Sequence, residues 1–242
     1  MMQNLTNQYL LSPLNIKGVI FKNRIFKTVG SGVETDLTAR TADRCDFLCD
    51  KDHVNTVSEN DLLKIQEIYA REAVMAEKEG YKVGVIHGET GTFLGNFISQ
   101  RENDRKDQWG GNFENRMRLV LSIIEKIHEA VGNKLIIEFC MSGAEFISNG
   151  YTVEEGIEIA KALDQKVDIL YVAAGVDGGK DSFYKKYPAM GILHGSNIRL
   201  ASEIKKHVNT LIATIGGLND PKMMNDIIAV GKADILYSDI LL

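Results

Sequence analysis

The stretch that decides the fold runs from residue 83 to residue 118 and begins Val83-Gly84-Val85-Ile86-His87-Gly88. A short apolar run that ends in a histidine and a glycine predicts a buried parallel strand with a polar group at its C-terminal end. We expect a long polar loop next, and then Gly110-Gly111 before a helix. Chemistry in α/β proteins gathers where parallel strands end, so this stretch is the first candidate for a functional site.

Strands and helices alternate on both sides of this stretch. Ser58 is a predicted N-cap with Asp61 at the third position, and Thr152 with Glu155 repeats the pattern at a later helix. Strand–helix pairs at this spacing predict right-handed βαβ units in one parallel sheet. The six predicted strands are 23–29, 83–86, 135–139, 169–173, 211–215 and 233–237.

A closed (β/α)₈ barrel needs eight strands. We therefore predict an α/β fold of the TIM-barrel type that is incomplete, with about six of its eight parallel strands, in a single domain over residues 1–242. Residues 9–22 are expected to form a hairpin that turns at Lys17-Gly18. Residues 33–60 are polar and weakly periodic, so we expect a loop there, with one or two helical turns near 41–48.

Composition narrows the classes of function. The 242 residues carry a formal net charge of −5, which argues against nucleic acid or an anionic membrane as the main partner. No apolar run is long enough to span a bilayer, and the first residues lack the pattern of a secretory signal. Three cysteines fit a reducing compartment, and we expect a cytoplasmic protein.

Several motifs together resemble the old yellow enzyme family, in its NADH:flavin oxidoreductase and 2,4-dienoyl-CoA reductase branch. The most specific is the run from Arg105 to Arg116, which is similar to the family's Arg-Thr-Asp-Glu-Tyr-Gly-Gly-Ser-Leu-Glu-Asn-Arg. The other matching segments are 14–16, 22–25, His87-Gly88, 141–146, 150–152, 194–197 and 213–218.

The resemblance implies a TIM barrel with FMN at the C-terminal mouth. Hydride passes from NAD(P)H to the flavin and on to a small-molecule substrate, an activated alkene such as an enone. It implies that His87 is the catalytic residue that bonds the substrate carbonyl, and that Lys27 and Thr28 lie beside the flavin ring. Gly216 and Gly217, at a tight turn after a strand, would hold the phosphate.

The chain also departs from the family pattern. Thr90 and Thr92 stand where the family has a second histidine and an aromatic residue, and Cys140 stands where it has a flavin-contacting arginine. Asp239 falls where the phosphate-binding arginine is expected. Residues 30–57 replace a much longer segment that contains two strands of the family barrel.

These departures leave alternatives open. The leading function is an FMN-dependent ene-reductase, and the rival is a degenerate, non-catalytic relative that acts at most as a binding or assembly module. His87 beside Glu89 invites a metal site, and so do Cys45 and Cys49, but without a further ligand we expect no bound metal. The missing strands would leave unpaired sheet edges, so we expect a homo-oligomer.

Overall fold

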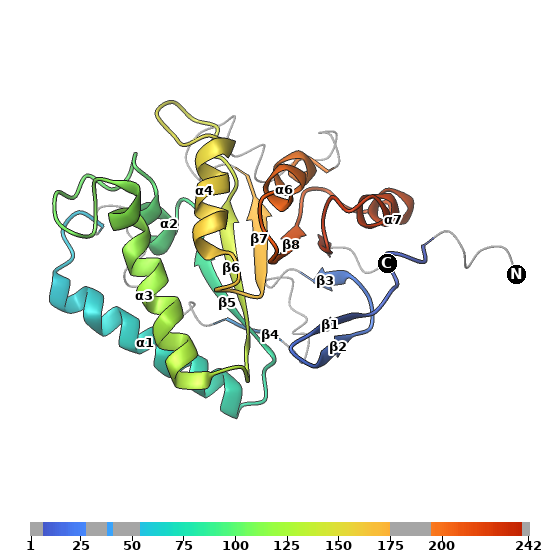
Figure 1. Cartoon of the computed structure of the whole chain (residues 1–242), viewed down its shortest axis with the longest axis horizontal. Helices are drawn as coiled ribbons and strands as arrows, with labels where there is room; N and C mark the ends of the chain where they lie inside the picture. The colour runs from blue at the N-terminus through green and yellow to red at the C-terminus, as the bar shows by residue number, and fades with distance from the viewer. Residues whose placement is uncertain (1–6, 28–37, 41–53, 175–194, 239–242) are drawn as a thin grey trace, which may run out of the picture.

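The computed structural model describes residues 7–27, 38–40, 54–174 and 195–238. Its main element is a seven-stranded sheet in the order β3-β9-β8-β7-β6-β5-β4, in which every neighbouring pair is parallel (Figure 1). The strands are β3 Ile25–Lys27, β4 Thr38–Arg40, β5 Val83–Gly88, β6 Ile136–Ser142, β7 Ile169–Ala173, β8 Leu211–Thr214 and β9 Ile235–Ser238. All six predicted strands are present, which confirms the incomplete TIM-barrel-type fold.

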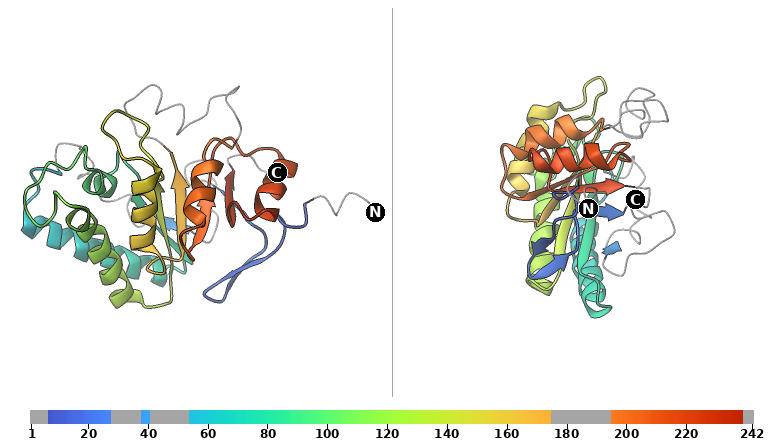
Figure 2. Two further views of the ribbon diagram at one scale, coloured as in Figure 1. Left: turned by 45° about the horizontal axis from the view of Figure 1, so that its top comes forward. Right: turned by 90° about the vertical axis from the view of Figure 1, so that its right-hand side faces the viewer.

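The helices lie along one face of this curled sheet, as the side view in Figure 2 shows. They are α1 Glu59–Lys78, α2 Phe93–Ile98, α3 Phe113–Val131, α4 Val153–Leu163, α6 Ile198–Lys205 and α7 Pro221–Ala229. Ser58 caps α1 as predicted, because its side chain accepts a hydrogen bond from the Asp61 amide at 3.1 Å. None of the helices in these described segments is long and apolar enough to cross a membrane.

The two faces of the sheet bury different sets of side chains. Ile86, Phe139 and Leu170 point outward and pack with α1 and α3 in the large core between sheet and helices. Residues one position away point inward, because successive side chains of a strand alternate between faces. The inward set, which forms the concave face, includes Phe26, Val85, Cys140, Ile169, Ala213 and Tyr237.

A small hairpin joins this inner core. β1 Leu14–Ile16 and β2 Val19–Phe21 pair antiparallel, as predicted. Lys17 and Gly18 both have positive φ, 48° and 83°, which is the backbone of a type I′ turn. Leu14, Ile16 and Phe21 are buried with the inward side chains of the sheet, so the hairpin covers part of the half-barrel.

Two expectations about loops were wrong. Residues 38–40 form β4, which pairs with the edge of β5, although residues 33–60 were predicted to be a loop. The predicted polar loop after β5 contains α2, whose residues are all buried and whose N-cap is Thr92. Both elements depend on tertiary partners: β4 on the exposed edge of β5, and α2 on contact with α3 and β5. The helical turns expected near 41–48 lie outside the described residues.

The predicted capping box of α4 does not form. Thr152 is the N-cap residue, but its side chain makes no capping hydrogen bond and its hydroxyl contacts Glu154 instead. Glu155, the expected reciprocal partner, forms an ion pair with Arg116 of α3. A long-range charge partner therefore outweighs the local cap.

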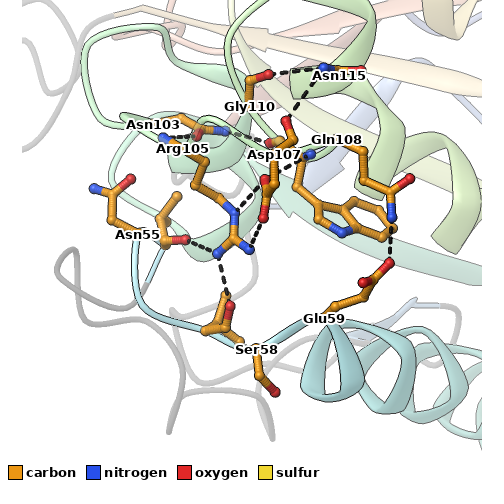
Figure 3. Close-up of polar contacts among 12 residues, drawn as sticks. Asn55, Ser58, Glu59, Asn103, Arg105, Asp107, Gln108, Gly110 and Asn115 are labelled. Carbon is orange, nitrogen blue, oxygen red and sulfur yellow. Dashed lines mark hydrogen bonds and ion pairs between the residues drawn. The ribbon is translucent and has the colours of Figure 1, made fainter.

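The run from Arg105 to Arg116, which resembles the family motif, forms a loop held by hydrogen bonds, drawn in Figure 3. The Arg105 guanidinium binds the Asp107 carboxylate at 2.5 and 3.1 Å and donates to the carbonyls of Val54 and Val57 at 2.9 and 2.8 Å. The Asn103 amide donates to the Trp109 carbonyl at 2.9 Å. These bonds fold the loop between α2 and α3 onto the segment that leads into α1.

Candidate functional site

His87 lies near the C-terminal end of β5, where the sequence predicted it. The β5–β6 register sets it directly beside Cys140, and the β6–β7 register sets Cys140 beside Tyr171. The three side chains therefore share one row on the concave face of the sheet. The His87 ring nitrogen Nδ1 lies 3.0 Å from a carboxylate oxygen of Glu89, which orients the imidazole.

A buried carboxyl lies one row below. Both oxygens of Glu138 accept hydrogen bonds from the Tyr237 hydroxyl, at 2.9 and 2.8 Å. Burial raises the pKa of Glu138 to about 7, although the Tyr237 hydrogen bond and the charge on His87 act against the rise. Tyr237 stacks edge-on against Tyr171, with ring centroids 4.8 Å apart. This network supports the row that carries His87 and Cys140.

Thr90 does not take over the role of the second histidine. It is 1% exposed, and its hydroxyl donates to the Glu145 carboxylate at 2.9 Å. Its backbone amide donates to the Ser142 hydroxyl at 3.1 Å. Thr90 therefore ties the turn after β5 to the end of β6 and to Glu145.

A second group of polar atoms surrounds the turn after β8. Gly216 and Gly217 have φ values of 136° and 63°, a region that favours glycine. A Cβ on Gly216 would lie 2.8 Å from the Ser196 hydroxyl, and the Gly195 amide donates to the Gly216 carbonyl. The backbone of this turn is therefore held close to the N-terminus of α6.

The Ser196 hydroxyl and both heteroatoms of the Asn197 side chain are buried without a hydrogen-bond partner in the segments that the structure describes. Buried polar atoms without partners are costly, which makes them candidates for binding a ligand. We call Ser196, Asn197, Gly216 and Gly217 the phosphate cradle. Its hydroxyl and amide donors at a glycine turn beside a helix N-terminus fit a phosphate group.

The remaining predicted residues lie in different places. Lys27 ends β3, beside Ser238 of β9. Because Phe26 points inward, strand alternation turns the Lys27 side chain to the other face, so only its backbone borders the concave face. Thr28, Asp239, Cys45 and Cys49 lie outside the described residues.

Two members of the cradle, Ser196 and Asn197, lie just before α6 and were not predicted as site residues. They belong to segment 194–197, which resembles the family, but that resemblance alone assigned them no binding role. Their signal was weak, because the contact that matters joins residues about 20 positions apart in the chain. Cys140 was noted only because it stands where the family has an arginine. The strand register makes it a neighbour of His87.

Residues 30–238 match the family model described as the NADH:flavin oxidoreductase / NADH oxidase family. The chain belongs to this family. It is the old yellow enzyme family indicated by the loop from Arg105 to Arg116, and its members are flavin-dependent oxidoreductases.

Three curated relatives support the assignment. An NADH oxidase of Thermoanaerobacter brockii is 37% identical in an alignment of 197 residues, which covers 79% of this chain and 29% of that protein. A cinnamate reductase of Clostridium sporogenes is 31% identical, over 69% of this chain and 27% of its own length. An NADPH dehydrogenase of Clostridium acetobutylicum is 26% identical, over 74% and 51%. The chain thus spans between about a quarter and a half of these relatives.

Solved structures show the same fold. A 2-naphthoyl-CoA reductase in complex with 2-naphthoyl-CoA matches with a TM-score of 0.75 and 18% identity, over 96% of this chain and 50% of that one. Histamine dehydrogenase from Rhizobium sp. 4-9 matches with a TM-score of 0.76 and 17% identity, over 96% and 46%. At these identities the likeness concerns the fold alone.

Proposed function

We propose that this chain binds FMN across the C-terminal mouth of its half-barrel and reduces activated alkenes with NAD(P)H. The observation that carries the proposal is the placement of two sites at the same edge of one sheet. His87 ends β5 and the phosphate cradle follows β8, three strands away in the order β8-β7-β6-β5. Three strand spacings amount to roughly 14 Å, a span suited to an elongated ligand with a phosphate at one end.

The cradle's chemistry supports the phosphate end of this proposal. Ser196 and Asn197 offer a hydroxyl and an amide as donors, and both are buried with no partner in the described chain. Gly216 keeps the turn free of a side chain where a Cβ would meet Ser196. A phosphate would supply acceptors for the Ser196 hydroxyl and for the NH₂ group of Asn197.

His87 supports the substrate end. When bound, the flavin would accept a hydride from NAD(P)H and supply it to the alkene, which also gains a proton, leaving a saturated product and NAD(P)⁺. The His87 imidazole would donate a hydrogen bond to the substrate carbonyl, which draws electron density from the conjugated double bond. Glu89 fixes the orientation of the ring at 3.0 Å. A relative named cinnamate reductase agrees with an unsaturated substrate conjugated to a carbonyl.

One observation favours a second candidate, a non-catalytic relative. Thr90 stands where the family has a second histidine, and its hydroxyl donates to the buried Glu145 carboxylate. A site with one donor in place of two would polarise a carbonyl less strongly. In this reading the chain retains the family fold as a binding or assembly module.

A flavin titration separates the two candidates. FMN is added to the purified chain, and its visible absorption and fluorescence are recorded before and after NADH is added under argon. If the chain is the ene-reductase, we expect a saturable shift of the flavin absorption band and bleaching of that band by NADH. Protein that leaves the flavin spectrum unchanged at high micromolar FMN would exclude the ene-reductase and leave the binding module.

The role of His87 is tested on the flavin-loaded protein. His87→Ala is expected to lower turnover of an enone by a factor of about 10² or more, the loss typical for one preorganised donor, with FMN affinity unchanged. His207→Ala is the matched control, because His207 lies beyond α6 and its side chain is 39% exposed. Equal turnover in the two variants would show that His87 is a structural residue of the rim.

A further inference from the structure

The mouth of the half-barrel brings together a histidine, a carboxylate and a thiol that are scattered in the sequence. His87, Glu89 and Cys140 each place one ligand atom within 4.8 Å of the others. Cys140 meets His87 through the parallel register of β5 and β6. Glu89 comes from the turn after β5 and folds back onto the imidazole. The third ligand that the sequence did not reveal is therefore supplied by the neighbouring strand.

We propose that His87, Glu89 and Cys140 form a binding site for a divalent metal ion of the Zn²⁺ type. An imidazole nitrogen, a carboxylate oxygen and a thiolate sulfur are the three kinds of ligand that Zn²⁺ takes in proteins. Three protein ligands leave the fourth tetrahedral position open, facing the mouth. The mixture of a soft sulfur with nitrogen and oxygen selects against Mg²⁺ and Ca²⁺, which prefer oxygen alone.

The spacing of the cluster is close to what a metal needs. With metal–ligand distances of about 2.0–2.3 Å, neighbouring ligand atoms of a tetrahedral site lie roughly 3.3–3.7 Å apart. The imidazole and carboxylate atoms already lie 3.0 Å apart. The largest distance between two ligand atoms of the cluster is at most 4.8 Å. Side-chain rotations that move these atoms by about 1 Å would bring them to the spacing of a metal site.

The surroundings of the cluster also suit a cation. The Cys140 side chain is buried, whereas the side chains of His87 and Glu89 are 29% and 16% exposed, which leaves a path from solvent. Tyr171 lies beside Cys140 in the next strand, and the Glu138 carboxyl lies one row below. The Glu89 carboxylate and a Cys140 thiolate, gathered at one place, lower the energy of a dication there.

The proposed metal site goes beyond the proposed flavin chemistry and shares one residue with it. A metal ion on His87 Nδ1 would replace the contact with Glu89 that orients the imidazole for a substrate carbonyl. Metal binding is therefore measured on flavin-free protein, so its outcome does not depend on whether FMN binds. If FMN also binds, Zn²⁺ should inhibit alkene reduction.

Cobalt provides the direct test, because Co²⁺ replaces Zn²⁺ and its spectrum reports the ligands. The chain is stripped with a chelator under reducing conditions and titrated with CoCl₂. We expect visible bands of tetrahedral intensity and a thiolate-to-cobalt charge-transfer band, saturating at one Co²⁺ per chain and displaced by ZnCl₂. Cys140→Ser should abolish the charge-transfer band, and Glu89→Gln should weaken affinity at least about tenfold.

The controls use the other two cysteines. Cys45→Ala/Cys49→Ala should keep the charge-transfer band, whereas its loss in this variant and retention in Cys140→Ser would place the metal elsewhere and overturn the proposal. No saturable cobalt spectrum in the unmodified chain would also overturn it. Circular dichroism checks that each variant folds, and Glu89→Gln, in a partly exposed turn, keeps the test decisive if substitution of buried Cys140 unfolds the chain.

Discussion

Lys17 Nζ lies 2.8 Å from Asp168 Oδ2, and this ion pair joins the turn of the β1–β2 hairpin to the segment just before β7. The same ammonium donates to the Leu135 carbonyl at 3.2 Å, and the same carboxylate accepts from the Ile137 amide at 2.8 Å. Two residues about 150 positions apart thus fix the hairpin to the N-terminal ends of β6 and β7.

Replacing Asp168 should destabilise the fold more than replacing Lys17. Lys17→Met is expected to lower the free energy of unfolding by about 1 kcal/mol, the upper range for a partly exposed pair. Asp168→Ala should cost roughly 1–3 kcal/mol more, because it also leaves the Ile137 amide without its acceptor. Urea denaturation measures both, and Lys64→Met, from an exposed pair on α1, should change little. Equal losses in all three variants would contradict the role of Asp168 as a bridge.

Arg116 is a second long-range connection, and its replacement should be among the most damaging in the chain. It is 5% exposed, donates to the carbonyls of Ile98 and Gly111 at 2.8 Å each, and pairs with Glu155. Arg116→Met is expected to cost about 3–5 kcal/mol, since two carbonyls and a carboxylate lose their partner. Arg118→Met, on the exposed side of the same helix, should cost less than about 1 kcal/mol in the same thermal or urea unfolding.

Two glycines at close contacts should respond differently to alanine. A Cβ on Gly95 would lie 2.0 Å from the Glu89 carbonyl oxygen, which is backbone, whereas one on Gly143 would meet the Val172 side chain at 3.0 Å. Gly95→Ala must displace the turn that carries Glu89, so we expect it to cost more than about 3 kcal/mol. Gly143→Ala should cost about 1–3 kcal/mol, because side chains can shift. Chemical denaturation ranks the two, and the reverse order would contradict this account.

Asn197 offers a test that separates ligand binding from stability. Its side chain is fully buried, with no partner for its heteroatoms in the described chain. Asn197→Leu should leave the ligand-free protein as stable as before or more stable, by up to about 1–3 kcal/mol, because an unsatisfied amide is removed. The same variant should bind FMN more weakly in a fluorescence titration. A large loss of stability without FMN would show that Asn197 has a structural role instead.

Asp107 should make stability depend on pH in a defined direction. The hydrogen bond from Arg105 lowers the pKa of Asp107 below its usual 3.8, so the ionised carboxylate stabilises the folded state. This contribution is present above the usual pKa and is lost as the pH falls through the lower pKa of the folded protein. Asp107→Asn should therefore be less stable than the unmodified chain near pH 6, with a difference that shrinks below about pH 4. Because the side chain is 47% exposed, the effect is small, and urea midpoints at several pH values measure it.

Much of the sheet followed from local pattern. Apolar runs such as 135–139 and 169–173 are buried on both faces of a parallel strand, so their composition alone marks them. Ser58 capped its helix and Lys17-Gly18 formed the turn because these effects act within a few residues. The loop from Arg105 to Arg116 was identified by its resemblance to the family motif, whereas its bonds to Val54, Val57 and Ile98 came only with the tertiary structure.

The site was less predictable for a physical reason. The sequence by itself determined that His87 ends a strand and that Gly216-Gly217 ends another, because both follow from one segment each. Only the tertiary structure decided that Cys140 lies beside His87, that β4 covers the edge of β5, and that Ser196 and Asn197 meet the glycine turn. Strand register and the curl of the sheet set those contacts, and neither is encoded in the spacing of residues along one element.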